Sequence, residues 1–215
     1  MKEVILQVEE AVKKSMESID ESGHDWAHIQ RVVKVARWIA EQEKADVEIA
    51  TLIALLHDVD DHKFSTADEH ENLTRTQAIL NRVHLSENIK NHILSDIQGV
   101  SFKGAQVADR QLSPEGTAVR DADRLDAMGA VGIARAFSYG GYKQRPFYDD
   151  THPEQHASFE AYKNSAGSTV NHFHEKLLLL KERIVTPSAK MMAEKRHQFM
   201  LDFLQRFEAE VEGKS

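Results

Sequence analysis

The 215-residue sequence predicts an all-α protein, and two observations carry this prediction. Apolar residues recur at the i, i+3, i+4 and i+7 positions that place them on one helix face, as in Ile29, Val32, Val33 and Ala36. The chain also has four prolines, and the alternation of apolar and polar residues that marks a half-buried strand is scarce.

Helices are expected, in chain order, over residues 3–18, 25–43, 46–58, 67–83, 86–98, 115–124, 126–138, 167–181 and 187–210. The apolar spacing is clearest at residues 29–36, 49–56 and 200–207. Two stretches rich in glycine and proline, 99–114 and 139–166, predict loops. The second loop is long enough to act as a lid or binding loop, although a surface excursion explains it equally well. We expect one domain spanning residues 1–215.

The composition excludes several classes of protein. Asp and Glu total 35 against 27 Lys and Arg, which gives a net charge of −8, and 41% of residues are hydrophobic. This mixture excludes wholesale disorder, and the acidic balance argues against nucleic acid as a partner. The absence of cysteine excludes disulfides, thiolate zinc sites and cysteine nucleophiles. No apolar run is long enough for a signal peptide or a membrane span, so a cytoplasmic protein without membrane contact is expected.

A His–Asp pair, His57 and Asp58, ends the most apolar predicted helix. Because a buried polar side chain is costly without a partner, the pair must be hydrogen-bonded or bound to a metal ion. The pair alone favours the hydrogen-bonded interpretation.

A second polar group opens the helix predicted at residue 25. His24 and His28 are four residues apart and share a helix face, and His28 borders the apolar stripe. Arg31 follows near that face, and an imidazole with a nearby guanidinium suits a metal–phosphate site. The alternative is an amphipathic helix capped by Asp25 with a surface arginine.

Three acids, Asp121, Asp123 and Asp126, precede a stretch rich in small residues. For Asp121 and Asp126 we favour a solvated helix N-terminus that benefits from the helix dipole. Taken together, His28, His57, Asp58 and Asp123 form a nitrogen and oxygen donor set from three predicted helices. Such a set suits Mn²⁺, Fe²⁺, Mg²⁺, Co²⁺ or Ni²⁺ better than structural zinc.

The segments GHDWAHIQRVV, LIALLHDVDDHKF, VSFKG and DADRLDAMGAVGIARAF resemble the HD-domain superfamily of metal-dependent phosphohydrolases. The closer likeness is to a bacterial branch of predicted HD hydrolases, which NHFHEKLLLL and AKMMAEKRHQFM also resemble. The resemblance covers residues from about 20 to about 207. It implies a helical HD bundle of about 8–10 helices, with core motifs over 24–126 and the C-terminal helices 167–210 packed on them.

The resemblance also implies roles for individual residues. His28, His57, Asp58 and Asp123 fall on the metal ligands, and His24 on a position that orients them. Asp61, three residues after the HD aspartate, falls on the position of a catalytic carboxylate in some relatives. The histidines between residues 58 and 123 show no companion spacing, which favours one divalent ion, with Mn²⁺ preferred.

The expected activity is hydrolysis of a phosphorylated metabolite, with a nucleotide favoured. The expected phosphate-binding residues are Arg31, Lys103, Arg124 and Arg145. A pyrophosphohydrolase acting on (deoxy)nucleoside triphosphates is preferred, while a 5′-nucleotidase or phosphomonoesterase, a cyclic-nucleotide phosphodiesterase and a non-catalytic nucleotide-binding module stay open. A homodimer is compatible with the sequence.

Overall fold

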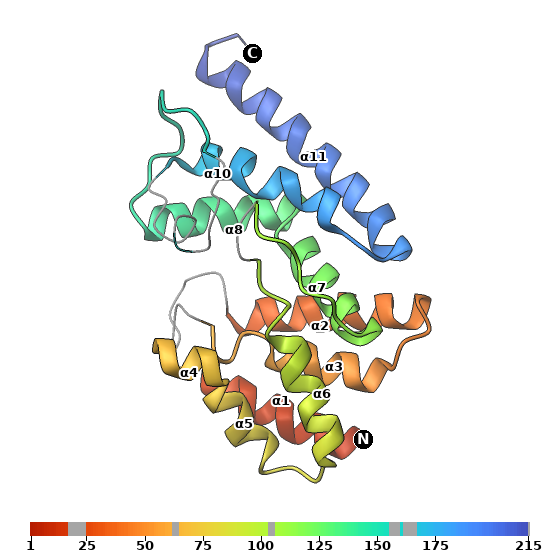
Figure 1. Cartoon of the computed structure of the whole chain (residues 1–215). Helices are drawn as coiled ribbons and strands as arrows, with labels where there is room; N and C mark the ends of the chain where they lie inside the picture. The colour runs from red at the N-terminus through yellow and green to blue at the C-terminus, as the bar shows by residue number, and fades with distance from the viewer. Residues whose placement is uncertain (17–24, 62–64, 103–105, 155–159, 161–166, 215) are drawn as a thin grey trace. The chain divides into compact units, whose positions relative to one another are not determined.

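The computed structural model describes residues 1–16, 25–61, 65–102, 106–154, 160 and 167–214 (Figure 1). These residues form helices, turns and loops and contain no strand, which confirms the all-α prediction. They divide into two compact units, Met1–Ser101 with Asp109–Asp123, and Phe102–Ala108 with Arg124–Ser215. The boundary falls within α7 (Pro114–Asp126), whose residues therefore belong to both units.

The first unit is built around α3 (Val47–Leu56), whose residues from Ile49 onward are all buried. A helix that is apolar on every side is expected at the centre of a core. It packs against α1 (Lys2–Met16), α2 (Trp26–Gln42) and α6 (Glu87–Ile97). Asp25 and Asp46 cap α2 and α3, as polar residues at helix N-termini commonly do.

The helix predicted over 67–83 is instead two helices, α4 (Ala67–Asn72) and α5 (Thr74–Leu80). Leu73 separates them in the left-handed region, with φ 50° and ψ 45°. The carboxylate of Asp60 accepts hydrogen bonds from the backbone N–H groups of Arg75 at 2.9 Å and Thr76 at 2.8 Å. A residue distant in sequence therefore satisfies the first turn of α5, which makes the break stable.

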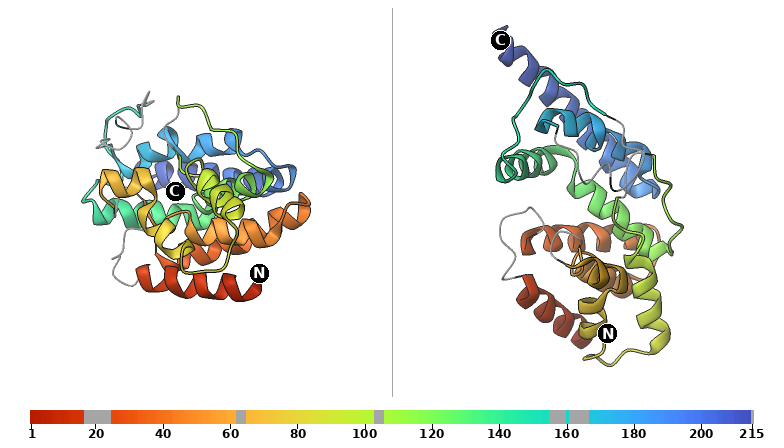
Figure 2. Two further views of the ribbon diagram at one scale, coloured as in Figure 1. Left: turned by 60° about the horizontal axis from the view of Figure 1, so that its bottom comes forward. Right: turned by 60° about the vertical axis from the view of Figure 1, so that its left-hand side comes forward.

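The second unit contains α8 (Gly129–Tyr142), α10 (Thr169–Glu175), the 3-10 helix η1 (Leu177–Arg183) and α11 (Pro187–Val211). Helix α8 packs against α10 and α11, and α11 also packs against η1. The rings of Phe137, Phe173 and Phe203 meet within this unit, with centroids 5.9–6.1 Å apart. The C-terminal end of α11 extends beyond the unit's other helices (Figures 1 and 2).

Two predicted helices of the second unit differ from those observed. The helix predicted over 167–181 is interrupted at Lys176, where φ is −139° and ψ is −61°, and continues as η1. The helix predicted over 126–138 begins at Gly129 and continues through Gly140 and Gly141 to Tyr142. A Cβ at Gly140 would lie 2.2 Å from Thr169 Oγ1, so this glycine permits close packing between α8 and α10 and does not end the helix.

Candidate metal centre

His28 enters the core of the first unit from the first turn of α2. Its backbone N–H donates a 2.8 Å hydrogen bond to Asp25 Oδ1, which fixes the start of the helix. The side chain is fully buried. The predicted cap at Asp25 is therefore present, and the same cap positions the histidine.

His57 and Asp58 lie where α3 ends, and both are buried. His57 Nδ1 lies 2.8 Å from the carbonyl oxygen of Ala54, and this contact assigns the ring proton to Nδ1. Nε2 therefore carries a lone pair, and it is buried without a hydrogen bond within the described part of the chain. An imidazole held in this way is ready to bind a cation.

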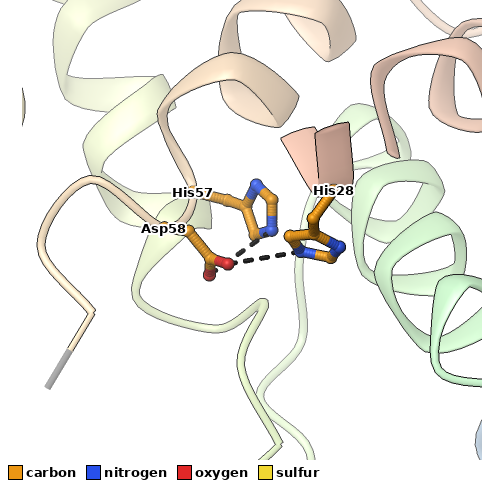
Figure 3. A group of neighbouring side chains, drawn as sticks. All are labelled: His28, His57 and Asp58. Atoms are coloured by element: carbon orange, nitrogen blue, oxygen red, sulfur yellow. Dashed lines mark ion pairs between the residues drawn. The ribbon is translucent and has the colours of Figure 1, made fainter. Parts of the chain in front are cut away.

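The three side chains point toward one another (Figure 3). One ligand atom from each of His28, His57 and Asp58 lies within 4.8 Å of the others. Asp58 Oδ2 is 3.2 Å from His28 Nε2, and Asp58 Oδ1 is 3.4 Å from His57 Nε2. The carboxylate and His57 Nε2 offer lone pairs to each other in a buried place, so a cation between them fits this donor set.

Asp123 brings a carboxylate to the same place from α7. Its Oδ1 lies 3.5 Å from His28 Nε2 and 3.9 Å from His57 Nε2. The side chain is 24% exposed, whereas those of the two histidines are fully buried. The structure thus gathers all four residues predicted as ligands, and Asp123 forms the most accessible side of the group.

Asp61 lies in the turn that follows the His–Asp pair. Its backbone N–H donates a 3.1 Å hydrogen bond to the carbonyl oxygen of Asp58, and the residue is buried. The neighbouring Asp60 holds the start of α5 and contacts His70. The sequence analysis missed this role because the residues that Asp60 contacts lie far from it in sequence. His70 Nδ1 lies 2.6 Å from the Asp60 carbonyl oxygen.

The predicted phosphate-binding residues are distributed over both units. Arg31 is half-buried on α2. Arg124 is buried, and its guanidinium donates a 2.6 Å hydrogen bond to the carbonyl oxygen of Arg183. Arg145, in the second unit, lies 6.0 Å from the ring centroid of Tyr139. Lys103 and His24 lie outside the described residues.

The interpretation of Asp121 and Asp126 as a solvated helix N-terminus is wrong. Helix α7 begins at Pro114 and ends at Asp126, so neither acid lies in its first turn. Both are buried, and Asp126 Oδ2 lies 2.7 Å from Arg135 Nη1. A buried carboxylate is stable when it is paired and hydrogen-bonded, which explains its position here.

Comparison with known proteins identifies the family. Residues 25–128 match the HD domain model. YpgQ of Bacillus subtilis is 38% identical over 214 residues, covering 97% of this chain and 96% of that protein. The chain therefore belongs to the HD-domain family, which includes HD-superfamily hydrolases and binds divalent metals.

Solved structures share the fold over nearly the whole chain. A Lactobacillus plantarum protein superposes with a TM-score of 0.87 and 34% identity, covering 99% of both chains. YpgQ in complex with ADP superposes with a TM-score of 0.76 and 33% identity, covering 98% of this chain and all of that one. An HD-superfamily hydrolase from Bacillus thuringiensis superposes with a TM-score of 0.75 and 39% identity, covering 98% of each chain.

None of the helices in the described part of the chain combines the length and apolar character needed to cross a bilayer.

Proposed function

We propose that this protein is a divalent-metal-dependent phosphohydrolase that cleaves a nucleoside triphosphate to the monophosphate and pyrophosphate. The observation that carries the proposal is the buried group of His28, His57 and Asp58, with Asp123 at its accessible side. Support for a nucleotide comes from YpgQ, which was crystallised in complex with ADP and is 38% identical.

His28, His57, Asp58 and Asp123 would hold one ion, with Mn²⁺ our choice among the metals that accept nitrogen and oxygen ligands. Such an ion lowers the pKa of a water molecule and polarises the phosphorus centre. Imidazole and carboxylate donors without a thiolate are typical of catalytic sites of this kind.

Asp61 is our candidate for the general base. It follows Asp58 by three residues, and its backbone N–H donates a hydrogen bond to the Asp58 carbonyl oxygen. The position of Asp61 therefore depends on the position of Asp58. A carboxylate placed there would take the proton of the attacking water or hold that water in line. Arg31, half-buried on the same helix as His28 and three residues further on, would neutralise charge on the phosphate.

A nucleotide panel with identified products tests the proposal. Purified protein is assayed with nucleoside mono-, di- and triphosphates and cyclic nucleotides in Mn²⁺, Mg²⁺ or Co²⁺, and products are separated by anion-exchange chromatography. We expect triphosphates to give monophosphate and pyrophosphate, without stepwise release of orthophosphate. An Asp58→Ala protein purified in parallel controls for contaminating phosphatases.

The alternative outcomes are distinct. Nucleoside released from a monophosphate, with triphosphates untouched, would establish a nucleotidase. Opening of a cyclic nucleotide would establish a phosphodiesterase. Nucleotide binding without any turnover would establish a binding module.

A further inference from the structure

One peptide unit in the turn after α3, the unit that joins Asp60 to Asp61, is hydrogen-bonded on both of its sides. Its N–H, which belongs to Asp61, donates to the carbonyl oxygen of Asp58 at 3.1 Å. Its carbonyl oxygen, which belongs to Asp60, lies 2.6 Å from Nδ1 of His70 on α4. A carbonyl oxygen only accepts hydrogen bonds, so Nδ1 of His70 carries a proton and donates. The plane of this rigid peptide is therefore fixed from both sides.

His70 lies on a short helix whose first turn is well defined. Thr66 caps α4, because its side chain accepts a hydrogen bond from the N–H of Glu69 at 3.3 Å. The Glu69 carboxylate in turn accepts one from the N–H of Thr66 at 2.9 Å, which completes a capping box. The N–H of His70 donates to the Thr66 carbonyl oxygen at 3.0 Å. The half-buried imidazole therefore projects from a fixed backbone position.

Asp60 is bonded to both of the helices that Leu73 separates. Its carboxylate accepts hydrogen bonds from the N–H groups of Arg75 and Thr76 at the start of α5. Its carbonyl oxygen accepts the one from His70 on α4. The break between the helices thus lies between two anchors on the same residue, and these anchors fix His70 relative to the turn.

The peptide held in this way sets the starting position of the Asp61 side chain, which is buried. Rotation of the peptide between Asp60 and Asp61 would change the φ angle of Asp61 and move its carboxylate relative to Asp58. A misplacement of about 1 Å at a reacting group can reduce a rate by about a hundredfold. Proton transfer to Asp61 therefore depends on what holds this peptide as well as on the carboxylate itself.

We propose that His70 is a positioning residue for Asp61 and acts through its hydrogen bond to the carbonyl oxygen of Asp60. The proposal rests on the proposed function in taking Asp61 as the general base. It requires no contact of His70 with the metal ion or the substrate. Removal of the imidazole should loosen the peptide and slow the chemical step, while metal affinity and substrate binding stay the same.

Three substitutions on α4 separate this role from a purely structural one. His70→Ala removes the donor. His70→Asn restores it, because the amide nitrogen of asparagine is as many bonds from the backbone as Nδ1 of histidine. Glu71→Ala changes the exposed neighbouring residue on the same helix and is the control. Circular dichroism and metal content, measured on each full-length protein, establish that it folds and is loaded with metal.

Hydrogen exchange of the Asp61 amide, followed by NMR on the Mg²⁺-loaded protein, reports the state of the peptide without any turnover. In His70→Ala this amide should exchange about fivefold faster or more, the factor expected when one hydrogen bond is lost. In His70→Asn and Glu71→Ala it should exchange at nearly the wild-type rate. An unchanged rate in the folded His70→Ala protein would overturn the proposal, whatever its activity.

Steady-state kinetics with a nucleoside triphosphate give the second measurement. The kcat of His70→Ala should fall by about tenfold to a hundredfold, with KM and the calorimetric affinity for Mn²⁺ nearly unchanged. His70→Asn should recover most of the lost kcat. A loss of Mn²⁺ affinity that matches the loss of kcat, or no recovery with asparagine, would reject the positioning role.

The wild-type protein decides if the variants do not fold. Nitrogen-15 NMR of the imidazole identifies the protonated ring nitrogen. A proton on Nδ1 of His70 supports the hydrogen bond to Asp60, and an unprotonated Nδ1 rejects that bond and the proposal with it.

The two proposals fail separately. A protein that hydrolyses no nucleotide, yet shows faster Asp61 exchange in His70→Ala alone, retains the positioning contact and lacks the proposed function. A protein that hydrolyses triphosphates with the same kcat in His70→Ala as in the wild type retains the function and lacks the positioning role.

Discussion

His57 Nδ1 lies 2.8 Å from the carbonyl oxygen of Ala54, three residues earlier in α3. The bond uses a carbonyl that the end of the helix leaves without an intrahelical partner. It fixes the ring and directs Nε2 toward Asp58 and Asp123, at 3.4 and 3.9 Å. The end of one buried helix thus sets both the position and the tautomer of a candidate metal ligand.

We expect purified protein to contain about one divalent metal ion per chain, and His57→Ala or Asp58→Ala to lose it. Each substitution removes one donor from the group around His28. Elemental analysis by mass spectrometry measures the content. His152→Ala, which changes an exposed histidine, is the control. Full metal content in both ligand variants would contradict the assignment.

Removal of the metal should also lower the melting temperature, because a ligand bound only to the folded state stabilises it. A chelator should therefore lower the melting temperature of the wild type and leave that of His57→Ala unchanged. An equal shift in both proteins would mean that the ion binds elsewhere.

Asp61→Asn should keep the metal and the fold but reduce turnover by roughly 10²–10⁴-fold, the usual contribution of a general acid–base group. The amide keeps the size of the buried side chain and cannot accept the proton. Steady-state kinetics and metal content are measured on the same preparation. Loss of metal would make Asp61 a ligand, and full activity would place the base elsewhere.

Asp60→Ala should lower the free energy of unfolding by about 1–3 kcal/mol, because the N–H groups of Arg75 and Thr76 lose their acceptor. Urea denaturation measures the change. The variant should retain its metal ion, which separates this capping role from the roles of Asp58 and Asp61. A stability equal to that of the wild type would show that water replaces the cap without cost.

The strongly periodic segments could be predicted from sequence because their burial follows from local spacing. The helix expected over 187–210 is observed as Pro187–Val211, and that over 25–43 as Trp26–Gln42. The same local reasoning placed His57 and Asp58 at the end of a buried helix, where they lie. His28 and Asp123 were joined to this pair as one nitrogen and oxygen donor set, and the resemblance to the HD family then implied the same four residues as ligands. The structure brings both within 3.9 Å of the pair.

The features that were missed depend on contacts between distant residues. The break at Leu73 is stabilised by Asp60, and the sequence around 67–83 contains no glycine or proline that would indicate it. Asp126 is buried because Arg135 on α8 pairs with it, whereas its charge suggested exposure. Local patterns describe which face of a helix is apolar, but they do not identify the partner of a buried charge.

His197 should make stability depend on pH. Burial lowers its pKa from the ordinary value of 6.5, and the nearby Lys181 lowers it further, against an opposing effect of Glu194. Between 6.5 and the lower native pKa, the unfolded chain binds a proton that the native protein does not, so stability falls as pH decreases through this range.

His197→Gln removes this contribution. The free energy of unfolding of the wild type should therefore fall more steeply than that of the variant between pH 7.5 and pH 5.5. Urea denaturation at several pH values measures both proteins. Parallel pH profiles would show that the pKa of His197 is the same in the native and unfolded states.

Two adjacent glycines of α8 should respond oppositely to alanine. A Cβ at Gly140 would lie 2.2 Å from Thr169 Oγ1 on α10, and Thr169 is buried, so either the Thr169 side chain or one of the two helices must shift. Overpacking of this kind costs about 1–3 kcal/mol. At Gly141 a Cβ meets no atom within 4 Å, so alanine should be neutral or stabilise the helix by up to about 1 kcal/mol.

Thermal and urea denaturation of Gly140→Ala and Gly141→Ala measure this difference. Thr169→Ala combined with Gly140→Ala removes the hydroxyl that the new methyl group would meet. The double variant should therefore recover part of the loss, and the recovery is the coupling between the two positions. Equal effects of the two single substitutions, or strictly additive effects in the double variant, would show that α8 and α10 do not depend on the close approach at Gly140.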